Sequence, residues 1–176
     1  TLSFDGSPDN EQFMAYTQHI APLAKASEEA RKAMSDSGAT EAGKKAGQAI
    51  VDKNMADIEK YRTDFVAANP DVIMSVLFKG MQDVKLPAEL QHPKNRKDSL
   101  AQYRFGKEHY WDGIDFMDGR LVRTPILEGK MKTYLNNWVV PDADSIIYEF
   151  NWMVALGRND PEMFKYLIGY YVDNYM

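Results

Sequence analysis

The chain has 176 residues, of which 44% are hydrophobic and 12% aromatic, a composition typical of globular proteins. Its net charge of −5 is evenly spread: residues 1–95 carry 11 basic and 14 acidic side chains, and residues 96–176 carry 10 and 12. No half of the sequence is basic enough to indicate nucleic-acid binding. The absence of cysteine excludes thiol catalysis, disulfides and thiolate metal sites from this chain.

The length suits one domain or two small helical lobes, and we predict a single all-α domain over residues 1–176. No apolar run approaches the ~20 residues that a membrane-spanning helix needs. The chain opens at Thr1 without a methionine and stops at Met176 inside a helical pattern. We therefore expect a piece excised from a longer protein, and the only strand-like residues are Thr1–Phe4.

Four dipeptides place a good N-cap residue directly before a proline, which favours a helix start. They are Ser7-Pro8, Asn69-Pro70, Thr124-Pro125 and Asp160-Pro161. The first predicts a helix from about residue 8, which Pro22 should kink or split. After a turn at residues 35–40, a second helix should run to about Ala68 and pack on the first as an antiparallel hairpin.

Apolar residues at helical spacing predict five further helices. They lie after Pro70, from Leu100 to Ile114, and over residues 126–138, 146–154 and 164–171, and residues 85–96 form a loop. We predict about seven helices, arranged as successive helical hairpins in an irregular bundle or a short right-handed stack.

The stretch from His109 to Leu127 is the most distinctive part of the sequence. Its aspartates, Asp112, Asp115 and Asp118, are three residues apart, whereas a calcium loop needs acidic ligands at alternate positions. We expect no metal and no cofactor. The simpler interpretation is a structural motif in which Trp111 and Phe116 are buried and Asp115 or Asp118 caps a helix or pairs with arginine. Its residues are Tyr110, Trp111, Asp115, Phe116, Asp118, Arg120, Arg123, Thr124 and Pro125.

Two other interpretations of this stretch stay open. Asp112 and Asp115, beside aromatic rings, could form the carboxylate pair of a carbohydrate- or peptide-processing enzyme, which requires both carboxylates in one pocket. A small-ligand or peptide-binding helical module would instead need an aromatic-lined pocket of a few hundred Å³.

The last predicted helix carries tyrosines that do not fit on one apolar stripe with Phe164, Leu167 and Ile168. We expect some of these rings to be exposed and to form an interaction surface. The tyrosines are Tyr166, Tyr170, Tyr171 and Tyr175.

Several segments together resemble a known family. They are Ser7-Pro8-Asp9-Asn10, Tyr61 through Pro70, Tyr110 through Phe116, Asp118, Arg120-Leu121, Arg123 through Leu127, and Pro141-Asp142. The family is the helical domain of unknown function found upstream of the thioredoxin-like domain in bacterial cell-envelope thiol:disulfide interchange proteins.

This resemblance implies a periplasmic or cell-envelope location, between a β-rich N-terminal domain and a C-terminal thioredoxin-like domain. Residues 1–6, including Thr1–Phe4, would then be the end of the preceding β domain. It also implies that the chain is not itself an enzyme. As an accessory domain it would position the redox domain or receive a client protein or peptide, while thiol-disulfide oxidoreductase activity would belong to another domain of the parent protein.

Overall fold

The computed structural model describes residues 6–176, so the strand expected at Thr1–Phe4 lies outside the described residues. The chain forms two compact units, Thr1–Phe78 and Lys79–Met176. Within residues 6–176 there are seven α-helices, two short 3-10 helices and no β-strand. The predicted all-α class is confirmed.

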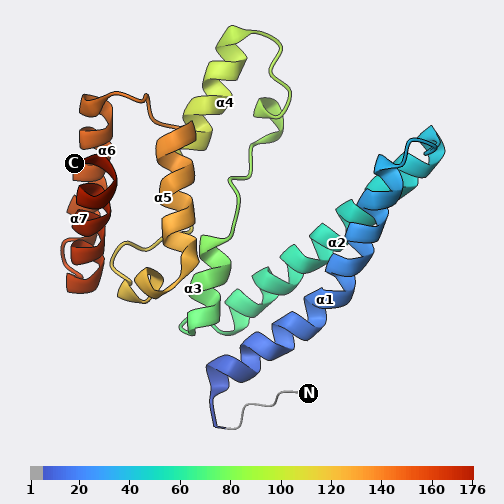
Figure 1. Ribbon diagram of the computed structural model, residues 1–176, viewed down its shortest axis with the longest axis horizontal. Coiled ribbons are helices and arrows are strands. Elements are labelled where there is room, and N and C mark those ends of the chain that lie inside the picture. Colours follow the sequence, from blue (N-terminus) through green and yellow to red (C-terminus); the bar gives the residue numbers. More distant parts are fainter. Residues whose placement is uncertain (1–5) are drawn as a thin grey trace. The chain divides into compact units, whose positions relative to one another are not determined.

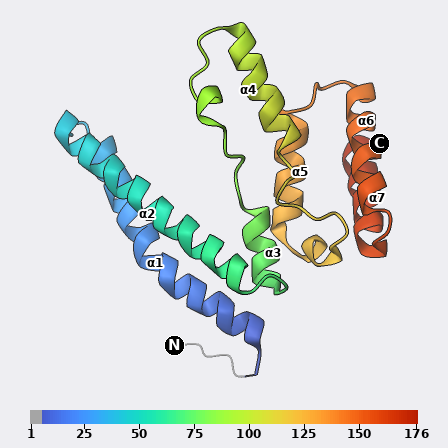
Figure 2. The same cartoon turned by 180° about the vertical axis from the view of Figure 1, so that it is seen from behind.

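Unit 1 is built on a long helical hairpin. Helices α1 (Pro8–Ser35) and α2 (Glu41–Ala68) pack against each other along their length, as Figures 1 and 2 both show. Thr40 caps α2 by accepting a hydrogen bond from the Gly43 backbone N–H at 3.1 Å. Helix α1 continues through Pro22, so the predicted split does not occur.

The core of unit 1 lies where the hairpin meets α3 (Ile73–Gly80), whose residues up to Phe78 belong to this unit. Tyr16, Met74 and Phe78 form the buried centre, with the Tyr16 and Phe78 ring centroids 4.7 Å apart. Arg62 closes the cluster: its Nε donates a hydrogen bond to the Tyr16 hydroxyl at 2.8 Å. The two helices of the hairpin alone would bury little apolar surface. Helix α3 adds a third packing surface to this small core.

Unit 2 contains the remaining helices. These are η1 (Ala88–Leu90), α4 (Arg96–Glu108), η2 (Gly119–Arg123), α5 (Pro125–Asn137), α6 (Ala143–Gly157) and α7 (Pro161–Tyr175). Helices α6 and α7 lie side by side, and η2 contacts both α5 and α7. The fully buried hydrophobic side chains of this unit are Leu121, Leu127, Met131, Met153, Met163 and Leu167.

Two expected boundaries were wrong. Asn69-Pro70 does not begin a helix: Asn69 is the C-cap of α2, and α3 starts at Ile73. Asn69 is non-helical, as a residue before proline tends to be, and residues 70–72 form a turn before α3 begins. Helix α4 stops at Glu108 and does not reach Ile114, because successive tight turns follow it.

Candidate functional site

Two aromatic residues of the motif, Trp111 and Phe116, are buried in unit 2, and Tyr110 is half-buried. The side chains of Trp111 and Phe116 are 7% and 4% exposed, with ring centroids 5.3 Å apart. The Tyr134 ring of α5 lies 5.0 Å from the Trp111 ring. Tyr110 anchors the turn by donating its hydroxyl to the Lys130 carbonyl at 3.0 Å. The motif therefore joins the end of α4 to α5 through packed rings.

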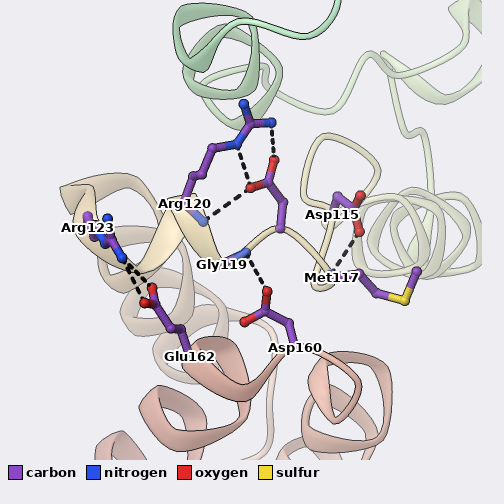
Figure 3. A pocket seen from close by; sticks show the side chains of 8 residues that line it. Asp115, Met117, Gly119, Arg120, Arg123, Asp160 and Glu162 are labelled. Carbon is purple, nitrogen blue, oxygen red and sulfur yellow. Dashed lines mark hydrogen bonds and ion pairs between the residues drawn. The ribbon is translucent and has the colours of Figure 1, made fainter.

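The charged residues of the motif line a polar pocket of about 470 Å³, shown in Figure 3. Asp118 is the N-cap of η2, and its carboxylate accepts hydrogen bonds from the Arg120 backbone N–H at 3.1 Å and from Arg120 Nε at 2.8 Å. These hydrogen bonds, with the guanidinium charge, hold the pKa of Asp118 below its ordinary value. Asp115 closes its own turn by accepting from the Met117 backbone N–H at 2.8 Å.

The same pocket shows how η2 is fixed to α7. Asp160 caps α7 by accepting from the Met163 N–H at 2.8 Å, and its other oxygen accepts from the Gly119 N–H at 3.2 Å. Arg123 pairs with Glu162 at 2.7 Å, although both side chains are largely exposed. Each carboxylate drawn in Figure 3 thus accepts a hydrogen bond from a backbone N–H or from an arginine.

Thr124 and Pro125 lie at the junction between η2 and α5. Pro125 is the first residue of α5, and the Thr124 hydroxyl donates to the Leu121 carbonyl at 2.8 Å instead of capping α5. Both residues therefore help to end η2 and start α5.

We expect Asp118→Ala to lower the free energy of unfolding by about 1 kcal/mol at neutral pH, the usual size for a lost N-cap. The pKa of Asp118 is lower in the folded state than its ordinary value of 3.8. The contribution of Asp118 to the free energy of unfolding is therefore present at pH values above 3.8, and it is lost as the pH falls through the pKa of the folded state. Urea unfolding of both proteins at neutral and at acidic pH measures this. A difference that stays constant into acid would contradict the assignment.

Asp112 and Asp115 do not share a pocket. Asp112 accepts from, or pairs with, His109 Nδ1 at 2.7 Å and lines a separate hollow of about 300 Å³ with Tyr110 and Asp83. Asp115 lines the pocket of Figure 3, and neither of these two pockets contains both carboxylates. Within residues 6–176 no group of three or more His, Asp or Glu side chains is placed to hold a metal ion.

A third hollow of about 360 Å³, here called the aromatic cleft, opens between α4 and α6, with Trp111 and Tyr134 in its lining. The cleft is lined by Tyr103, Arg104, Lys107, Glu108, Trp111, Tyr134, Tyr148, Glu149 and Trp152. Among its rings, Trp111 and Tyr134 are buried, whereas Tyr148 is 71% exposed and Trp152 is 40% exposed. The cleft has the size and the aromatic lining that a binding module requires.

A buried ionic network forms the base of the aromatic cleft. The side chain of Glu149 is almost fully enclosed, and its Oε1 pairs with Lys107 Nζ at 2.8 Å. Its Oε2 accepts the Tyr134 hydroxyl proton at 2.9 Å. Burial, together with this carboxylate, raises the pKa of Tyr134 well above its ordinary value, so the hydroxyl stays protonated as the donor. The network ties α4, α5 and α6 together beneath the open rings.

Of the residues that line this cleft, only Trp111 was among the candidate site residues predicted from the sequence. Tyr148 and Trp152 lie at i and i+4 on α6, as do Tyr103 and Lys107 on α4, so each pair shares one helix face. Those spacings could have identified the two walls. They could not have shown that the two walls face a common hollow.

The C-terminal tyrosines pack inward more than expected. Tyr170, Tyr171 and Tyr175 surround the buried Phe150 ring of α6, with centroid distances of 6.1, 4.8 and 5.6 Å. Tyr166, Tyr170 and Tyr171 are half-buried, and Tyr175 is 38% exposed. The more exposed apolar stripe of α7 consists of other residues, namely Phe164, Ile168 and Val172.

These tyrosines give an expected pH dependence. Burial raises the pKa of Tyr166 to about 12, with a further contribution from the Glu128 carboxylate, and burial also raises the pKa of Tyr170 and Tyr175. A phenol that ionises less readily when folded stabilises the fold at low pH, and this stability is lost as pH rises from 10 through 12. We expect the free energy of unfolding to fall across that range, and to fall less steeply in Tyr166→Phe. Equal slopes by urea unfolding would contradict this.

The fold and the site together define the class of protein. It is an all-α protein whose second unit carries an aromatic cleft. The chain belongs to the family described as Domain of unknown function (DUF5106), whose model matches residues 39–176 and so covers α2 through α7. No curated protein and no solved structure matches the chain. Among residues 6–176, no helix has both the length and the apolar character that crossing a membrane requires.

Proposed function

We propose that this chain is a non-catalytic interaction domain of a bacterial cell-envelope thiol:disulfide interchange protein. It positions the thioredoxin-like domain of the parent protein or receives a client protein or peptide, and it works in the periplasm. The redox cysteines belong to another part of the polypeptide, because this chain has none.

One contrast supports a binding role over a catalytic one. The motif aspartates are engaged locally, Asp115 with the Met117 N–H and Asp118 with Arg120, while the aromatic cleft presents open ring faces. Catalysis by a carboxylate pair needs two carboxylates that converge on one substrate. Asp112 and Asp115 line separate pockets, so the enzyme interpretation lacks the arrangement that it requires.

The resemblance of the motif supports the redox context. The family match agrees with the resemblance as far as a domain of unknown function is concerned. It assigns no activity to that domain. The envelope location and the neighbouring domains therefore rest on the motif residues from Tyr110 to Leu127.

The intact gene product tests this proposal. We expect it to contain a thioredoxin-like segment with a Cys-x-x-Cys pair and to reduce a protein disulfide such as those of insulin. Replacing both cysteines by serine should abolish the activity and leave the melting temperature of this domain unchanged. An intact gene product without a redox cysteine pair would refute the thiol:disulfide assignment.

A further inference from the structure

We propose that the aromatic cleft of unit 2 is the docking site for an extended peptide segment of a partner protein. The segment places an uncharged apolar side chain, such as proline, leucine or an aromatic ring, against Tyr148 and Trp152. This inference rests on the proposed function, because it names the partner that an interaction domain receives.

The base of the cleft favours an apolar side chain. Each carboxylate oxygen of Glu149 already has a partner, Lys107 at 2.8 Å and the Tyr134 hydroxyl at 2.9 Å. The buried charge is therefore neutralised within the protein. A saccharide would need free donors and acceptors at this depth, whereas the paired network leaves mainly ring surface to contact.

The rings at the opening suit a polypeptide partner. Tyr103, Tyr148 and Trp152 are 39%, 71% and 40% exposed, and together they form an open aromatic lining in unit 2. Tryptophan, tyrosine and arginine dominate the binding energy of protein interfaces. Aromatic-lined grooves also receive extended, proline-containing segments, whose restricted backbone loses little entropy on binding.

The charges at the opening suit a peptide backbone. Arg104 and Glu108 lie one helical turn apart on α4, are both exposed and both line the cleft. Neither side chain has an ion pair or hydrogen bond with any residue in 6–176. A guanidinium that donates and a carboxylate that accepts are complementary to the C=O and N–H groups of an extended chain.

A buried donor in the lining adds to this complementarity. The indole Nε1–H of Trp111 is buried and forms no hydrogen bond of good geometry; the group that it interacts with is the Tyr134 hydroxyl, which itself donates to Glu149. A buried donor that is poorly satisfied within the fold is unfavourable, and a carbonyl of a bound peptide is a suitable acceptor. We therefore expect the Trp111 indole N–H signal to respond to peptide binding.

The experiment begins with selection of short random peptides displayed on phage against the immobilised chain. Enriched sequences are then titrated as synthetic peptides, by fluorescence anisotropy, against the wild type, Tyr148→Ala and Arg104→Ala. Phe164→Ala and Arg158→Ala are the matched controls, because both residues are exposed in unit 2 and lie outside the cleft lining. An oligosaccharide of N-acetylglucosamine is titrated in parallel.

We expect enriched peptides to share an uncharged apolar residue and to bind Tyr148→Ala about tenfold more weakly, which is ~1.4 kcal/mol. Arg104→Ala should bind severalfold more weakly, and both controls should bind as the wild type does. Unchanged melting of Tyr148→Ala would show that the contact, and not the fold, is lost.

Three outcomes would overturn the proposal. They are equal peptide binding by Tyr148→Ala and Phe164→Ala, failure to enrich any peptide, and Tyr148-dependent binding of the oligosaccharide in place of peptide. The redox activity of the intact gene product is a separate measurement, so its failure and the failure of peptide binding are distinguishable.

Discussion

Phe116→Ala is expected to lower the free energy of unfolding of unit 2 by about 3–5 kcal/mol, the usual cost of removing a buried aromatic ring. The ring is 4% exposed and contacts Trp111 and Trp152, at centroid distances of 5.3 and 5.9 Å. Its removal would leave a cavity beneath two residues of the aromatic cleft. Because the chain's three tryptophans, at positions 111, 138 and 152, all lie in unit 2, tryptophan fluorescence during urea unfolding reports this unit.

Phe164→Ala is the matched control for this change. The same truncation is made at a ring that is 42% exposed on α7, and we expect a loss of at most about 0.5 kcal/mol. Similar losses in the two variants would mean that Phe116 is not a packing centre of the motif.

Gly113→Ala is expected to destabilise unit 2 by about 3 kcal/mol, at the upper end of the usual cost of overpacking. A Cβ atom at this position would overlap the backbone carbonyl oxygen of Lys79, which cannot move as the end of a flexible side chain can. The turn after α4 therefore requires glycine here because of a close backbone approach. Thermal and urea unfolding of the variant measure the cost.

Gly129→Ala provides the opposite control. Gly129 lies within α5, and a Cβ atom there would meet nothing within 4 Å. Alanine is favoured over glycine in a helix interior, so this variant should be more stable by about 0.5–1 kcal/mol. If both glycine variants lose stability to a similar extent, the close approach at Gly113 is not the cause.

Helix positions were predictable where local signals were strong. The second helix was expected to reach Ala68 and ends there, and Pro8, Pro125 and Pro161 each begin a helix. The burial of Trp111 and Phe116 also followed from the sequence, because two large rings in a short loop need a core to enter.

The aromatic cleft could not be predicted in the same way. In α6 the apolar Ile147 is 42% exposed, whereas the charged Glu149 is buried, which is the reverse of what their side chains alone would suggest. Glu149 is stable there only because Lys107 of α4 and Tyr134 of α5 neutralise and bind it. That pairing joins residues of three different helices, so the residue pattern of α6 alone could not predict it.

Under the proposed function the intact gene product exchanges disulfides, and the rate of this exchange tests most directly whether this domain binds or catalyses. The rate is measured with a protein client and with a small disulfide, for the wild type, Tyr148→Ala and Asp112→Asn/Asp115→Asn. We expect Tyr148→Ala to slow exchange with the client only, and the aspartate variant to match the wild type with both substrates. Loss of activity in the aspartate variant, with Tyr148→Ala unaffected, would contradict a non-catalytic binding domain.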